Sequence, residues 1–148
     1  MLSFHYTFKT EIKNGKTFKN VTDMVQDSFT ERDVNTITIE NNVITGKDKL
    51  FKLDFSQRSP LVISPGKEYF IYEEDTGVLT YKIEAFYSIL FNIAYAGILF
   101  LILYNFVHHW IIELVIPVLF FIFITAIEYF QYQAVLNKIS GKLNETRL

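Results

Sequence analysis

The chain has 148 residues, a formal net charge of −2 and no cysteine. The lack of cysteine excludes a disulfide scaffold, a cysteine zinc site and a thiol nucleophile. A net charge near zero argues against a nucleic-acid partner, because nucleic-acid-binding domains normally carry a basic surplus.

Residues 1–84 are expected to form a small α+β domain that begins with a strand and a helix. Apolar and polar residues alternate over residues 4–9, which is the period of a half-buried strand. Apolar residues then recur at helical spacing over residues 17–31. This spacing predicts an amphipathic helix whose N-terminal cap is Thr17 or Asn20.

Five or six short strands are expected after this helix. Nearly all of their connections are short, so the sheet should be mostly antiparallel. The last two strands should form a hairpin around an acidic turn. The expected strands cover residues 37–39, 43–45, 51–55, 61–64, 68–72 and 78–84, with turns at residues 41–42, 46–48 and 74–77.

One helix of about four turns cannot cover both faces of such a sheet. The aromatic side chains of the last hairpin, Tyr69, Phe70, Tyr72 and Tyr81, argue against a wholly polar uncovered face. We therefore expect a strongly curved sheet or a homo-oligomeric contact. The last strand then runs into an apolar segment through Ala85 with no flexible linker. Two interpretations stay open: a stiff junction that can transmit displacement, or only one of the short connections that are common in proteins.

Two apolar segments are expected to cross a membrane as a helical hairpin. Residues 86–107 contain no charge, and residues 111–130 carry a glutamate near each end. Each has the roughly 20 apolar residues that a transmembrane helix needs, and the connection at residues 108–110 is too short for anything but an antiparallel pair. The alternative is a soluble helical hairpin with a buried core. That alternative requires a polar stripe at helical spacing, and residues 86–107 have too few polar side chains for one.

The distribution of basic residues predicts the orientation of the hairpin. Lys82 precedes the first segment, Lys138, Lys142 and Arg147 follow the second, and the tip has no Lys or Arg. The positive-inside rule then places both termini in the cytoplasm, including a short tail at residues 134–148. The start of the chain shows no signal peptide. Aromatic residues expected at the two interfaces are Tyr87, Tyr129 and Tyr132 on the cytoplasmic side and Trp110 on the other.

The second segment contains an ionisable residue, Glu128, which is costly within a membrane and therefore a candidate functional residue. Antiparallel helices would bring it to the depth of Ser88, with Asn92 and Thr125 slightly deeper. These four side chains could form a hydrogen-bonded seam between the helices. Two readings of Glu128 stay open: a structural group near the interface, or part of a proton or ion path.

The hairpin tip carries a weak metal-binding candidate. His109 and Glu113 are four residues apart and His108 adjoins them, so a helix would put two ligands on one face. The alternative is a polar interfacial loop. Because the chain has no phosphate-binding loop, GxSxG or HExxH motif, we expect no catalytic residue, metal or cofactor.

Three functions remain open from the sequence. The first is a non-enzymatic integral membrane protein of the cell (inner) membrane, whose cytoplasmic domain binds a protein partner or acts as a regulatory module. The second is a subunit of an oligomeric channel or transporter. The third is a membrane enzyme that acts at the cytoplasmic interface. The richness in Lys, Asn, Ile and Phe suits an AT-rich bacterial genome.

Overall fold

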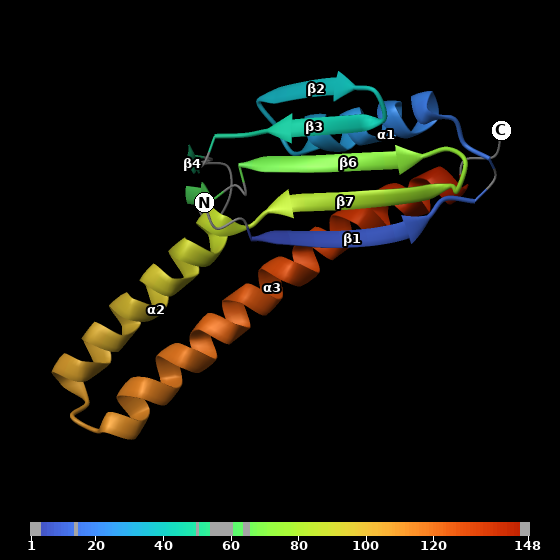
Figure 1. The fold of residues 1–148 in the computed structure, drawn as a ribbon. Helices are drawn as coiled ribbons and strands as arrows, with labels where there is room; N and C mark the ends of the chain where they lie inside the picture. The colour runs from blue at the N-terminus through green and yellow to red at the C-terminus, as the bar shows by residue number, and fades with distance from the viewer. Residues whose placement is uncertain (1–3, 14, 50, 54–60, 64–65, 146–148) are drawn as a thin grey trace.

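The computed structural model describes residues 4–13, 15–49, 51–53, 61–63 and 66–145, and Figure 1 shows the fold. Within these residues, an antiparallel sheet with one amphipathic helix is followed by two long apolar helices, which confirms the α+β class with a helical hairpin. The elements in chain order are β1 (His5–Glu11), α1 (Phe18–Glu31), β2 (Thr36–Glu40), β3 (Val43–Lys47), β4 (Phe51–Leu53), β5 (Leu61–Ile63), β6 (Lys67–Glu73), β7 (Val78–Glu84), α2 (Phe86–Phe106) and α3 (Trp110–Glu145).

The main sheet has the strand order β1-β7-β6-β3-β2, and every neighbouring pair is antiparallel. The final strand β7 lies between β1 and β6, so that Tyr6 pairs with Ile83. β4 and β5 form a separate two-stranded ladder. The turn expected at residues 46–48 was predicted to begin too early, because β3 continues through Lys47. The end of the expected 51–55 strand lies outside the described residues.

Helix α1 begins with the predicted cap. The Thr17 hydroxyl accepts a hydrogen bond from the backbone N–H of Asn20, whose side chain accepts one from the Thr17 N–H. The Glu74 carboxylate, in the turn between β6 and β7, accepts from another backbone N–H of this first turn. Farther along, the ring of Phe29 packs against Gly46 of β3, where a Cβ would lie only 2.6 Å from a ring carbon. Gly46 thus lets the helix approach the sheet.

One face of the sheet is covered by α1 together with the C-terminal part of α3 (Figure 1). Leu136, Ile139 and Leu143 of α3 are at most 2% exposed and belong to the same core as the buried side chains of β6 and β7. The structure therefore differs from the expected tail at residues 134–148, because residues 134–145 continue the helix. The curvature or homo-oligomeric contact expected for an uncovered face concerns the opposite face of the sheet and stays a prediction.

Two ion pairs orient α3 against α1. Glu31, the last residue of α1, accepts hydrogen bonds from Lys138 and Lys142 at 2.5 and 3.0 Å. These bonds lower the pKa of Glu31 from 4.5 to about 2. Because all three side chains are 42–58% exposed, the pairs contribute little to stability.

The hairpin formed by α2 and α3 projects away from the sheet (Figure 1). Both helices are long and apolar enough to cross a membrane, and only 11% of the most apolar stretch of each is buried. Large apolar side chains such as Leu101 and Phe123 are 58% and 64% exposed. This exposure argues against a soluble hairpin with its own buried core and indicates association with a membrane.

Candidate functional site

The sheet domain and the hairpin are joined without a flexible linker. A single residue, Ala85, separates β7 from α2; it is fully buried, and its backbone N–H donates to the carbonyl of Phe4 at 2.8 Å. The second connection is α3 itself, which runs without a break from the tip of the hairpin into the sheet core. With 36 residues, α3 is about 54 Å long at about 1.5 Å per residue. Two rigid elements thus join the two parts.

Four polar side chains line the contact between the helices beside this junction. Ser88 and Asn92 lie one turn apart on α2 and are only 2% and 4% exposed. Thr125 and Glu128 lie three residues apart on α3, and such spacing puts each pair on one helix face. Both faces turn inward, toward the partner helix, so the polar groups avoid the apolar exterior of the hairpin.

The Glu128 carboxylate is the centre of this group, which we name the seam (Ser88, Asn92, Thr125 and Glu128). Its Oε2 accepts hydrogen bonds from the Ser88 hydroxyl at 2.6 Å and from the Asn92 amide at 2.9 Å. The same amide nitrogen lies 3.4 Å from the Thr125 hydroxyl. The structure therefore brings together all four residues singled out in the sequence. Chemically, the seam can hold the two helices together through hydrogen bonds to the Glu128 carboxylate.

A second polar cluster lies in the core of the sheet domain, and sequence reasoning missed it. Glu68 of β6 is 5% exposed, yet both of its carboxylate oxygens accept from Nη1 of Arg32, at 2.9 and 2.8 Å. The Tyr81 hydroxyl donates to the same carboxylate at 2.5 Å. Burial raises the pKa of Tyr81 well above 10, and the Glu68 carboxylate raises it further. The sequence signal for this cluster was the strand alternation. Glu68 lies two residues before Phe70 and therefore on the same buried face of β6.

Tyrosines occupy the space between the seam and the Glu68 cluster. Tyr6 of β1 lies edge-on to Tyr129 of α3 at a ring separation of 5.6 Å and 6.1 Å from the ring of Tyr132. Burial raises the pKa of Tyr132, and the Glu128 carboxylate raises it further, with a smaller effect from Glu68. Two of the aromatic residues expected at the cytoplasmic interface thus pack against the sheet domain.

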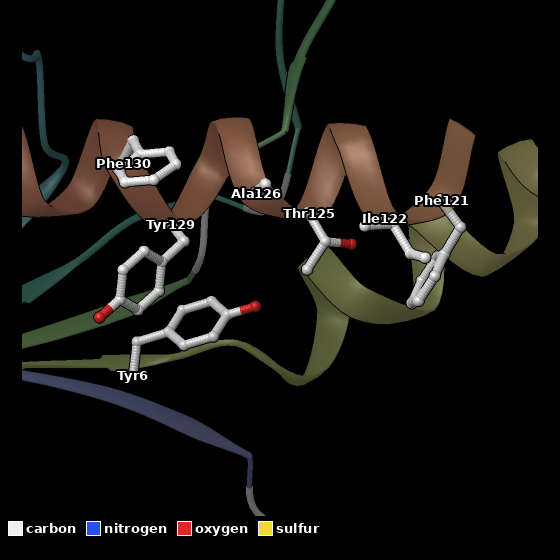
Figure 2. A pocket seen from close by; sticks show the side chains of 7 residues that line it. All are labelled: Tyr6, Phe121, Ile122, Thr125, Ala126, Tyr129 and Phe130. Carbon is white, nitrogen blue, oxygen red and sulfur yellow. The ribbon is translucent and has the colours of Figure 1, made fainter. Parts of the chain in front are cut away.

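An apolar groove opens beside these tyrosines along α3. Figure 2 shows the ring of Tyr6 facing the helix, with its hydroxyl toward Thr125. The groove has a volume of about 390 Å³ and no charged residue in its lining. Such a surface can hold an apolar group. Its lining residues are Tyr6, Phe121, Ile122, Thr125, Ala126, Tyr129 and Phe130.

The tip of the hairpin does not assemble the weak metal candidate. His108 turns the chain with a left-handed φ of 53°, and it lines a hollow together with Glu113. His109 does not line that hollow, and the Glu113 side chain is 7% exposed. Across the described part of the chain, no group of three or more His, Asp or Glu side chains is placed to hold a metal ion.

No protein-family model, curated protein or solved structure matches the chain.

The seam predicts a small but specific effect of mutation. Asn92→Leu removes two hydrogen-bond contacts with α3, and interhelical bonds of this kind are typically worth about 0.6 kcal/mol and at most about 1.7 kcal/mol. We expect the variant to remain folded and to lose stability within this range in a detergent unfolding titration. Ile93→Leu, at the exposed neighbouring position, is the control.

Cross-linking checks the geometry of the seam. Cysteines at positions 92 and 125 should form a disulfide on oxidation, whereas cysteines at the outward positions 93 and 123 should not. The reverse result would contradict the seam. Glu128→Gln keeps the shape of the side chain and removes its charge, so a structural Glu128 tolerates this change and a proton-carrying one does not.

Proposed function

We propose that this protein is a multi-pass protein of the cell (inner) membrane with both termini in the cytoplasm. In this proposal the sheet domain is a non-enzymatic module that binds a protein partner or regulates one. Its position against the membrane is set by the hairpin.

The dimensions of the hairpin support membrane insertion. Helix α2 has 21 residues, about 31 Å at about 1.5 Å per residue, which matches a hydrocarbon core of about 30 Å. The first 21 residues of α3 are equally apolar apart from Glu113 and Glu128. Lys82 lies at one end of the hairpin and Lys138 beyond the same end, while the tip has no basic residue. This asymmetry favours a cytoplasmic sheet domain.

The observation that carries the regulatory role is the continuity of α3. One helix supplies both the inner face of the hairpin and three buried side chains of the sheet core. Between Glu128 and the sheet core α3 contains no proline, since Pro117 lies on the tip side of the seam, and Ala85 alone separates β7 from α2 at the other connection. A displacement of the hairpin therefore moves the sheet domain with it, and a partner bound to the sheet domain acts back on the hairpin in the same way.

The two alternatives have less support. In a pore, Asn92, Thr125 and Glu128 would face water, but here they bond to one another or to Ser88 inside a single hairpin. An enzyme at the interface would need reactive groups around a bound substrate, and the groove beside Tyr6 has an apolar lining without charge.

Single cysteines test the membrane topology, because the chain has no native cysteine. Lys19 on α1 and His109 at the tip are both exposed, and each can be replaced by cysteine. In intact cells, an impermeant thiol reagent should label position 109 and leave position 19 unlabelled until the cells are opened. Labelling of position 19 but not 109 would reverse the orientation. Extraction of the protein by alkaline carbonate would contradict membrane insertion altogether.

A further inference from the structure

Two lysines lie directly opposite each other on the open face of the sheet. Lys47, the last residue of β3, pairs with Lys67, the first residue of β6. Their side chains are exposed and point away from the face that α1 and α3 cover, because the neighbouring Glu68 is buried on that face. Lys82 of β7 lies on the same open face, opposite Tyr69.

Like charges directly opposite each other destabilise a sheet, and one neighbouring carboxylate can offset at most one of the two charges. Neither Lys47 nor Lys67 forms an ion pair with a described carboxylate. The nearest acid in the strand register is Glu84 of β7, and its carboxylate instead accepts the Tyr69 hydroxyl at 2.6 Å. An external anion would relieve the repulsion between the two lysines.

The lysine pair lies at the end of the sheet from which the hairpin leaves. β7 runs in the direction opposite to β6 and ends at Glu84, one residue before α2 begins. The start of β6 and the end of β3 lie at this same end of the sheet (Figure 1). If α2 crosses a membrane from Phe86 onward, this end is the part of the open face nearest to the lipid headgroups.

We propose that Lys47 and Lys67, assisted by Lys82, bind the headgroups of anionic phospholipids in the leaflet that the hairpin enters. This inference rests on the proposed membrane insertion. The lysine ammonium groups offer charge and several N–H donors to a phosphate, and long lysine side chains reach an interface readily. Binding here ties the open face of the sheet to the membrane surface, so the tilt of the sheet domain depends on the anionic lipid content.

The test uses the full chain in a neutral detergent, with thermal unfolding as the readout. Phosphatidylglycerol and phosphatidylcholine with identical acyl chains are titrated separately, and inorganic phosphate forms a third arm. A lysine near an anionic surface contributes roughly fivefold in affinity, so Lys47→Gln with Lys67→Gln should weaken the phosphatidylglycerol response roughly 25-fold. The control is Lys13→Gln with Lys19→Gln, which removes the same charge from exposed lysines after the far end of β1 and on α1 and should leave the response unchanged.

Three results would overturn the proposal. These are equal stabilisation of the wild-type protein by both lipids, an equal loss in the control variant, and stabilisation by inorganic phosphate as strong as that by phosphatidylglycerol. The salt dependence of the lipid preference tests the proposal on the wild-type protein. Raising ionic strength from about 0.1 M to about 1 M shortens the screening length from about 10 Å to about 3 Å and should abolish the lipid preference. Carbonate extraction tests insertion separately, so the two proposals fail independently.

Discussion

Replacing Glu68 with alanine should lower the free energy of unfolding by about 3 kcal/mol, the lower end of the range of about 3–5 kcal/mol for breaking a buried ion pair. The substitution leaves the Arg32 guanidinium without the carboxylate whose two oxygens accept from its Nη1, and it deprives the Tyr81 hydroxyl of its acceptor. The lower end applies because the Arg32 side chain is 27% exposed. Denaturant unfolding of the purified chain measures the change.

Two further variants show whether the loss of stability comes from leaving the Arg32 guanidinium without its carboxylate partner. Glu11→Ala removes an exposed carboxylate from the same domain and should change stability by less than about 0.5 kcal/mol. Replacing Glu68 by leucine and Arg32 by methionine together should recover much of the loss, because a buried pair replaced by apolar groups leaves no unpaired charge. A cost for Glu68→Ala no larger than that for Glu11→Ala would contradict a stabilising role for this cluster.

Removal of the C-terminal part of α3 should prevent the sheet domain from folding on its own. Leu136, Ile139 and Leu143 are nearly fully buried against the sheet. At about 1.5–3 kcal/mol for each buried side chain, their loss approaches the entire stability of a small domain, about 5–15 kcal/mol. Residues 1–84 alone should therefore lack a cooperative thermal transition in circular dichroism.

A peptide of residues 131–145 added to this fragment should restore the transition. The control peptide carries serine at positions 136, 139 and 143, and it should have no effect. Cooperative unfolding of the isolated 1–84 fragment as a monomer would show that α3 is dispensable for the sheet domain.

Local patterns in the sequence were sufficient to predict much of this architecture. The alternation in β1, the acidic turn between β6 and β7 and the cap at Thr17 each depend on residues close together in the chain. The hairpin followed from the uncharged segment and the three-residue connection. The depth-matched positions of Ser88 and Glu128 followed from the same short connection, because it fixes the register of two antiparallel helices.

The arrangement of the sheet depends on contacts that no local pattern encodes. The first strand pairs with the last, as Tyr6 does with Ile83, although the two are far apart in sequence. The sequence predicts a tail at residues 134–148, because the apolar segment ends shortly before them. The relevant signal was a change of pattern, from a uniformly apolar helix to one with Leu136 and Ile139 on a single face. At this change of pattern, the continuous helix α3 leaves the apolar hairpin and enters the core of the sheet domain.

The most direct test of the rigid coupling is a distance measured between the two parts of the protein in a lipid bilayer. Spin labels at Thr38 on the edge strand β2 and at His109 on the tip, both exposed positions, report it by pulsed electron resonance. One narrow distance distribution is expected, and insertion of two glycines after Phe130 should broaden it. A wild-type distribution as broad as that of the glycine variant would contradict the rigid coupling of hairpin and sheet domain.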